Sequence, residues 1–200
     1  MSLTFNKENH EYRIDGVVIP SVTQVIEAVG LSNFGGVNNE LLERAAAFGD
    51  AVHAAINYKC KGTLDEDSID PALIPYLQGW ENFVEDYGYV RHETEYCGHS
   101  ELYRFGFTID QMGVFNGKAI HMGKVLVDIK TGHPYPAHKY QMAGYVLGAG
   151  KEYKNIILLY LNPEFHRGYK VVFSKNNKRE QSVFLAALTI YNVRREEGLL

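Results

Sequence analysis

Two charged residues stand at the end of an apolar segment that has the alternation of a β-strand. In residues 125–130, Asp128 and Lys130 point to one face of the expected strand, whereas Val127 and Ile129 point to the other. Placing two charges there costs several kcal/mol unless they pair with each other or bind an ion. This segment alone leaves both explanations open, and a buried Asp–Lys ion pair is the simpler of the two.

A second acidic residue, Asp110, favours the ion. It lies on the preceding apolar strand, and Asn116-Gly117 between the two strands is a strong hairpin signal because both residues tolerate positive φ. Asp110 stands six residues before this turn and Asp128 eleven after it. A bulge or an irregular turn, for which Gly123 is a candidate, is therefore needed to bring the two carboxylates together.

Two converging carboxylates repel each other, and a hard divalent cation such as Mg²⁺ relieves the repulsion. A cation held there can polarise a scissile phosphate and lower the pKa of a bound water. Lys130 beside it can orient or deprotonate that water, or neutralise charge that develops in the transition state. The pattern therefore indicates metal-assisted phosphodiester hydrolysis.

The elements that must position these residues alternate between helices and strands. Residues 3–19 predict a hairpin or meander, and Ser21 with Gln24 predicts a capping box on a short helix that ends near Gly30. A loop is expected over 32–39. Further helices are expected over 40–61, 71–87, 137–147 and 177–195, and strands over 89–97, 104–115, 119–130, 155–161 and 169–173. This order predicts an α/β (α+β) fold with a mixed central β-sheet flanked by helices.

Length and composition set the limits of this interpretation. With 200 residues, 46% of them hydrophobic, the chain can form one domain, 1–200. Within it we expect an N-terminal hairpin and helix appendage (1–40), a catalytic core (41–175) and a C-terminal helix (176–200). The start of the chain does not resemble a signal peptide, no apolar stretch is long enough to cross a membrane, and the two cysteines form no framework, so we expect a cytoplasmic protein.

Charge is distributed unevenly along the chain. Residues 1–117 carry a net charge of −11 and residues 118–180 a net charge of +7, although the whole chain is at −4. A locally basic surface can hold phosphates without a basic chain, but solvated faces of mixed sign explain the same numbers equally well. If DNA is the substrate, the phosphate track is expected among Lys139, Lys151, Lys154, Arg167, Lys170, Lys175, Lys178 and Arg179.

Several motifs resemble one nuclease superfamily. Asp110 followed by Asp128-Ile129-Lys130 resembles the core signature of the PD-(D/E)XK nucleases. Three further segments are similar to motifs of the branch that holds RecB-like domains and phage-type exonucleases: 49–53 to its Gly-x-x-x-His helix, 106–110 to its Gly-x-x-Asp strand, and 141–145 to its Gln-x-x-x-Tyr helix. Residues 20–23 also look like the N-terminal segment of some members. Each motif is weak alone, but their order makes the set specific.

The resemblance implies a restriction-endonuclease-like fold and cleavage of DNA with Mg²⁺ (or Mn²⁺). It implies that His53, Asp110, Asp128 and the Ile129 carbonyl hold the metal, and that Asp110, Asp128 and Lys130 carry the chemistry. Gln141 and Tyr145 are then candidates for binding substrate. It further implies an exonuclease that acts on DNA in phage or bacterial recombination or repair. A single-strand annealing protein or a helicase is an expected partner, and a homo-oligomer is an expected assembly.

Simpler readings stand beside several of these assignments. A lone helical histidine is more often a core residue than a ligand, and Gln141 and Tyr145 would also suit a plain polar helix face. Glu95 is either an exposed strand residue or a further carboxylate of the metal site, and His133 and His138 are either loop residues or substrate contacts. A structure-selective endonuclease and a module that binds DNA or protein without cutting remain alternatives. The chain lacks a Walker A loop and the four cysteines of an iron–sulfur cluster.

Overall fold

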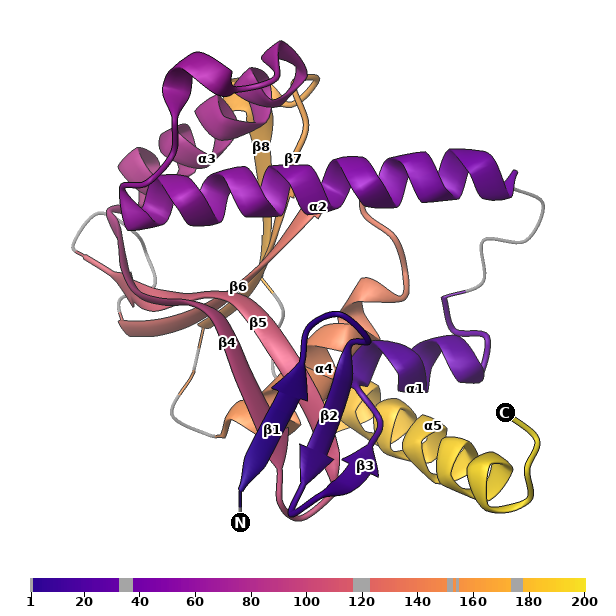
Figure 1. Ribbon diagram of the computed structural model, residues 1–200. Coiled ribbons are helices and arrows are strands. Elements are labelled where there is room, and N and C mark those ends of the chain that lie inside the picture. The colour runs from indigo at the N-terminus through magenta and orange to yellow at the C-terminus, as the bar shows by residue number, and fades with distance from the viewer. Residues whose placement is uncertain (1, 33–37, 117–122, 151–152, 154, 174–177) are drawn as a thin grey trace.

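The chain forms two β-sheets, and the larger sheet carries the segments singled out above. The computed structural model describes residues 2–32, 38–116, 123–150, 153, 155–173 and 178–200. The small sheet is antiparallel and contains β1 (Leu3–Asn6), β2 (Glu11–Ile14) and β3 (Val17–Ile19). The large sheet has the order β4 (Tyr89–Ser100), β5 (Phe105–Phe115), β6 (Gly123–Thr131), β7 (Asn155–Leu161) and β8 (Tyr169–Phe173). Its β6–β7 pair is parallel, and its other pairs are antiparallel (Figure 1).

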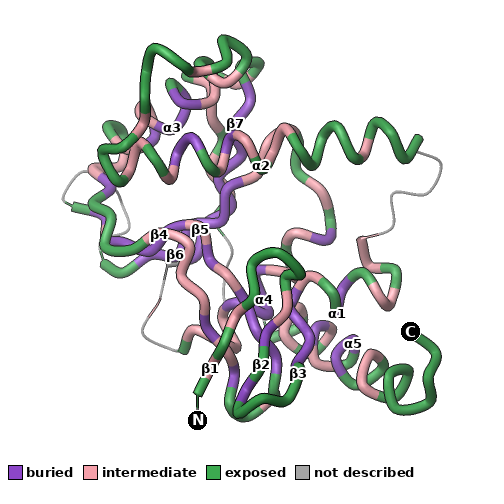
Figure 2. Tube along the Cα trace, in the orientation of Figure 1, coloured by how far each residue is buried: buried purple, intermediate pink, exposed green. Residues whose placement is uncertain are grey.

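Helices cover both faces of the large sheet. On one face, α2 (Asn39–Lys61) and α3 (Ile74–Tyr87) pack over a core that includes Val127 and Ile129 of β6. On the other face, α1 (Val22–Ala28), α4 (His138–Ala149) and α5 (Lys178–Glu196) pack over a core that includes Leu126. Short 3₁₀ helices cover Glu66–Ser68, Pro71–Leu73 and His166–Gly168. The expected α/β class with a mixed sheet flanked by helices is thus confirmed (Figures 1 and 2).

The first half of α2 extends beyond the body of the protein. Between residues 39 and 47 only Leu42 is partly covered, and Leu41 is 58% exposed. Figure 2 shows this half of the helix as exposed, whereas the half that follows contains buried residues over the sheet. None of the helices among the described residues is long and apolar enough to cross a membrane.

Most of the expected elements are found within a few residues of their expected bounds. The capping box of α1 is present, since the Ser21 hydroxyl accepts from the Gln24 N–H and the Gln24 side chain accepts from the Ser21 N–H. The helix expected from residue 71 begins with the 3₁₀ turn Pro71–Leu73 and becomes α-helical at Ile74. Most of the expected loop 32–39 and Gly117 of the expected hairpin turn lie outside the described residues.

The strands β5 and β6 stop pairing where the charged residues begin. Their register is regular from Phe115↔Gly123 to Gln111↔Val127, without a bulge, and no pair is formed beyond that point. The connection between the two strands therefore absorbs the offset between Asp110 and Asp128, which was one of the two expected solutions. Beyond Gln111, β5 continues alongside β4, whereas β6 continues alongside β7. We call this divergence the fork; the diverging strands are visible in Figure 1.

The small sheet is attached to β5 next to the fork. The Gly106 N–H donates to the Pro20 carbonyl at 2.8 Å, and the Tyr12 hydroxyl lies 2.6 Å from Thr108 Oγ1. The buried Tyr12 ring fills the space where a side chain on residue 106 would lie, because a Cβ there would come within 2.3 Å of Tyr12 Cγ. Glycine at position 106 thus allows the N-terminal sheet to dock.

We predict that Gly106→Ala lowers the free energy of unfolding by about 1–3 kcal/mol, because the added methyl group overpacks this contact. Urea denaturation followed by circular dichroism measures the change. In a Tyr12→Ala background the same substitution should cost much less, since the ring is no longer there to be displaced. Equal costs in both backgrounds would show that the Tyr12 contact does not decide the residue at position 106.

Candidate active site

Three groups from three elements meet at the fork. A nitrogen of His53 on α2 and carboxylate oxygens of Glu95 on β4 and Asp110 on β5 lie within 4.8 Å of one another. His53 Nδ1 is 3.3 Å from Asp110 Oδ1. The set thus includes two of the residues expected in the site, His53 and Asp110, together with Glu95, whose role the sequence left open.

The helix α2 holds His53 at the fork by packing its neighbours on the sheet. Val52 and Ile56 are buried in the core beneath the helix. Gly49, one turn before His53, lies against β6, since a Cβ at this position would come within 3.3 Å of Thr131 Oγ1. The small residue of the Gly-x-x-x-His pattern therefore allows the close approach of a strand.

Asp110 links the two diverging strands. Its Oδ2 accepts a hydrogen bond of 2.6 Å from the Ile129 N–H, while its Oδ1 faces His53. Burial alone would raise the pKa of Asp110, but the neighbouring His53 imidazole outweighs it and keeps the pKa below its usual value. Burial lowers the pKa of His53, and Asp110 more than compensates and raises it to about 9. Without a cation, His53 and Asp110 thus form an ion pair, and a bound cation would take the place of the proton.

Glu95 reaches the site from an unusual backbone conformation. Its φ is +53°, in the left-handed region that few residues other than glycine adopt. The flanking pairs Thr94↔Gln111 and Tyr96↔Ile109 place Glu95 across from Asp110. Burial, and then the charge of Asp110, raise the pKa of Glu95. Strained backbone of this kind is often found at functional sites.

Asp128 and Lys130 form an ion pair next to this group. Lys130 Nζ lies 2.9 Å from Asp128 Oδ2, and the Asp128 side chain is only 2% exposed. Lys130 is thus the group that offsets the charge of this buried carboxylate oxygen. Burial raises the pKa of Asp128 to about 6, with Asp110 adding to the shift and Lys130 opposing it. Burial lowers the pKa of Lys130, but Asp128 outweighs it and raises the pKa overall.

These donors suit a hard or intermediate divalent cation. Two carboxylates and one imidazole place their oxygen and nitrogen atoms within 4.8 Å of one another, and the buried Asp128 carboxylate, paired with Lys130, is a further acid beside them. Carboxylates are ligands for Mg²⁺ and Mn²⁺, which complete their coordination with water. Ile129 contacts Asp110 through its N–H. Coordination by the Ile129 carbonyl therefore remains a prediction.

Gln141 and Tyr145 on α4 contact each other. Gln141 Nε2 donates to the Tyr145 hydroxyl at 2.7 Å. Tyr145 is 4% exposed, and burial raises its pKa well above the usual value, with the charges of Asp128 and Asp110 adding to the shift. Tyr145 is therefore a buried neighbour of the acidic site, and substrate contact by either residue remains a prediction.

The expected phosphate track is only partly accessible. Arg167 is engaged at 2.8 Å with both Glu85 and Asp86 on α3, so two carboxylates neutralise it. Lys151, Lys154 and Lys175 lie outside the described residues. Lys139, Lys170, Lys178 and Arg179 are exposed, and Arg179 has an interaction of its own. We therefore omit Arg167 from the track.

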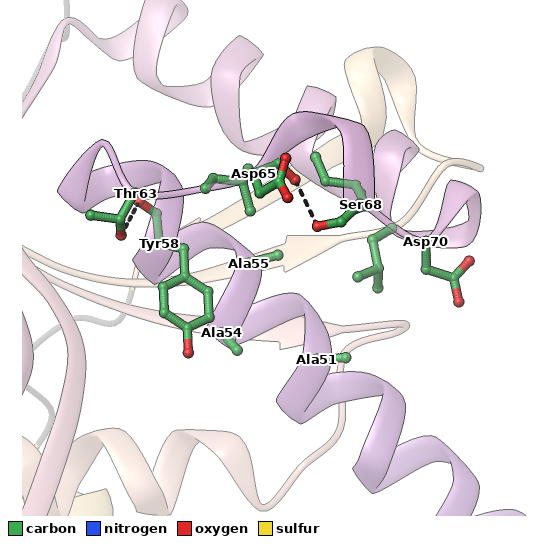
Figure 3. Close-up of a pocket in the computed structure, with 11 residues that line it drawn as sticks. Ala51, Ala54, Ala55, Tyr58, Thr63, Asp65, Ser68 and Asp70 are labelled. Atoms are coloured by element: carbon green, nitrogen blue, oxygen red, sulfur yellow. Dashed lines mark hydrogen bonds between the residues drawn. The ribbon is translucent and has the colours of Figure 1, made fainter.

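A cavity of about 470 Å³ lies away from the fork. It is formed by α2 and the connection that follows the helix, with Ala51, Ala54 and Tyr58 on the helix side (Figure 3). At 100° per residue, these positions lie on the side of α2 opposite to Gly49 and His53. The cavity does not include the site residues.

Tyr160 was not among the expected site residues, and His138 was expected as either a loop residue or a substrate contact, but the structure places both beside Lys130. Tyr160 is paired in register with Lys130 on the parallel strand β7, and its hydroxyl is 2.9 Å from His138 Nδ1. Tyr160 belongs to an apolar run, NIILLYL, that reads as core. Within this run, the hydroxyl group of Tyr160 was the feature of the sequence that could have pointed to a role in the site.

The chain is similar to several solved structures. An alkaline exonuclease, LHK-Exo, from Laribacter hongkongensis shares 18% identity over 74% of this chain and 84% of its own, with a TM-score of 0.39. LHK-Exo in complex with dAMP shares 15% identity over 90% and 93%, with a TM-score of 0.43. The structure of SSO0001 shares 18% identity over 71% and 73%, with a TM-score of 0.36.

No protein-family model matches the sequence, and no curated protein is similar to it. All three TM-scores are below 0.5, so we infer the function from the residues and motifs of this chain.

We predict that Mn²⁺ binds at the fork and that Glu95→Gln weakens its binding about tenfold or more, because one charged ligand is lost. Isothermal titration calorimetry with MnCl₂ measures the affinity. Glu93→Gln is the matched control, since Glu93 is an exposed glutamate on the same strand. If Glu95→Gln binds Mn²⁺ as tightly as the Glu93→Gln control does, Glu95 is not a ligand.

Proposed function

We propose that the protein is a deoxyribonuclease that depends on Mg²⁺ or Mn²⁺ and hydrolyses phosphodiester bonds of DNA. The observation that carries the proposal is the convergence of His53, Glu95 and Asp110 within 4.8 Å beside the Asp128–Lys130 pair. Two buried or half-buried carboxylates placed this close would repel each other without a cation. An ion pair alone would not need the additional imidazole and carboxylate.

We assign metal binding to His53, Asp110 and Asp128, with Glu95 as a further ligand and the Ile129 carbonyl as a candidate. A divalent cation held there would polarise the scissile phosphate and lower the pKa of the attacking water. The Ile129 N–H holds one Asp110 oxygen, so that the other can face the ion. Asp110 and Asp128 reach the site from the diverging strands β5 and β6.

Lys130 contributes a positive charge. Because Asp128 raises its pKa, Lys130 is protonated at neutral pH. A protonated lysine cannot accept a proton from water, and we favour the role of orienting the water and neutralising the charge that develops on the phosphate. Asp128 holds the ammonium group in place at 2.9 Å.

We further propose an exonuclease of phage or bacterial recombination or repair. Support for this comes from the motif resemblance, because the geometry of the fork serves internal and terminal cleavage equally well. DNA rather than RNA is likewise taken from the resemblance. Terminal and internal cleavage can be told apart with DNA substrates of defined topology.

The substrate test compares end-labelled linear duplex, end-labelled single strand and covalently closed circular DNA, each with Mg²⁺, Mn²⁺ or EDTA. We expect metal-dependent loss of label from linear DNA, with the closed circle left intact. Asp128→Ala should be inactive, since it removes the counter-charge of Lys130 and a ligand. Cleavage of the closed circle would indicate an endonuclease, and binding without cleavage would indicate a DNA-binding module.

Lys130→Ala should lower single-turnover cleavage by roughly 100-fold or more, the size of losing one group that stabilises transition-state charge. DNA binding and Mn²⁺ binding should stay close to those of the wild type. Lys59→Ala is a suitable control, because Lys59 is a lysine on α2 that pairs with Glu81 at the surface. Near-normal cleavage by Lys130→Ala would remove Lys130 from the mechanism.

A further inference from the structure

A row of polar side chains crosses the sheet beside Lys130. The register pairs Lys130 of β6 with Tyr160 of β7, and Tyr160 with Lys170 of β8. Partners in a ladder point to the same face of a sheet, and this face is the one covered by α4, since Leu158 and Val172 pack in that core. Two strand spacings separate Lys130 from Lys170, or about 10 Å between their backbones. The row therefore runs away from the fork, from one lysine to another.

His138, the first residue of α4, is fixed on the middle of this row. Its Nδ1 lies 2.9 Å from the Tyr160 hydroxyl and accepts from the Tyr135 N–H at 3.4 Å. A ring nitrogen that accepts from a backbone N–H cannot itself carry a proton, so the neutral ring carries its proton on Nε2. Burial, and then the charge of Lys130, lower the pKa of His138 to about 4, so the ring is neutral at physiological pH.

The Nε2–H of His138 is an open donor. Among the described residues nothing accepts a hydrogen bond from it, and it is not one of the buried polar atoms that lack a partner. Lys170 is exposed as well. The nearby acid at this edge, Glu164, lies 3.4 Å from His133 Nε2 and is itself exposed. A neutral N–H donor and an ammonium group therefore face solvent on the same side of the sheet as Lys130.

We propose that His138 and Lys170 form a second phosphate-binding subsite, which holds a backbone phosphate next to the one that is cleaved. Lys170 supplies the charge and His138 Nε2–H a directed hydrogen bond, while Tyr160 positions the imidazole. The ligand class is a phosphodiester of a nucleic-acid strand whose scissile phosphate lies at Lys130. This inference rests on the proposed function, because it takes the fork as the place of cleavage.

The alternative is that His138 and Tyr160 only stabilise the start of α4, with Lys170 as a solvated surface residue. In that case the loss of either side chain would change the stability of the protein. It would not change how strongly DNA binding depends on one particular phosphate. Replacing a single phosphate in the DNA by a neutral methylphosphonate separates the two roles, because the change is made in the ligand and not in the fold.

The experiment measures binding of fluorescein-labelled single strands by anisotropy in EDTA, where no cleavage occurs. A series of oligonucleotides carries one methylphosphonate at successive linkages from each end. For the wild type we expect one linkage at which the substitution weakens binding about tenfold, the size of one charge-assisted hydrogen bond. Lys170→Met and His138→Ala should each weaken binding to unmodified DNA to a similar extent and lose their sensitivity to that linkage.

Three further variants sharpen the result. His138→Gln keeps an N–H donor near the position of Nε2 and should recover most of the affinity lost in His138→Ala. Tyr160→Phe should leave the His138 proton on Nε2, because the Tyr135 N–H still donates to Nδ1, and two-bond ¹H–¹⁵N NMR spectra of the imidazole check this tautomer. Lys59→Met, a lysine on the acidic half of the chain, should bind DNA as the wild type does.

The proposal fails if no methylphosphonate in the series weakens DNA binding by the wild type. It also fails if the variant and the methylphosphonate reduce the affinity independently, so that the two factors multiply. Either outcome leaves the proposed function standing when the wild type still cleaves DNA with Mn²⁺. Conversely, a phosphate-specific loss in a protein that cleaves nothing would support the subsite and contradict the nuclease assignment. The two proposals can therefore fail separately.

Discussion

The hydrogen bond from the Ile129 N–H to Asp110 is the contact on which the site depends. Where β5 and β6 part, the backbone of β6 loses the carbonyl that a regular ladder would offer, and a buried N–H without an acceptor is costly. The Asp110 carboxylate supplies that acceptor at 2.6 Å. The Asp110 carboxylate thus accepts the free N–H of β6 with one oxygen and faces His53 with the other. Its position is fixed by this backbone hydrogen bond as well as by its charged neighbours.

This arrangement makes the two aspartates different. Asp110 has a backbone donor and an imidazole beside it, and its pKa is lowered, whereas Asp128 is more deeply buried and its pKa is raised to about 6. The pKa of Glu95 is also raised, by burial and then by the charge of Asp110. The charged form is therefore favoured most at Asp110, whereas burial opposes it at Asp128 and Glu95, and a bound cation would favour the charged form of all three acids. Lys130 and the His53 imidazolium together bring two positive charges to three carboxylates, and a divalent cation that replaces the His53 proton would supply the missing charge, which is the electrostatic basis of the proposed metal dependence.

Much of this fold follows from the sequence, because its signals are local. Alternation predicts the strands of the large sheet, and Ser21 with Gln24 predicts the start of α1. Asp110, Asp128 and Lys130 could be identified as a group because charges on apolar strands need a partner. The position of Glu95 could not, since it depends on a positive φ and on a register that only the assembled β4–β5 pair defines. His138 and Tyr160 meet through a parallel crossover, and sequence spacing carries no information about that contact.

The parts of the site are far apart along the chain, and this has a consequence for its synthesis. Tyr12 must find Thr108 and the small sheet must find β5 across nearly a hundred residues, while β6 has no parallel neighbour until β7 has been made. Loop closure over such distances delays assembly until most of the chain is available. A polypeptide still on the ribosome, or one released early, would carry the acids of the fork on strands that cannot yet hold them together. The proposed nuclease activity therefore depends on contacts that can form only after most of these strands have been synthesised.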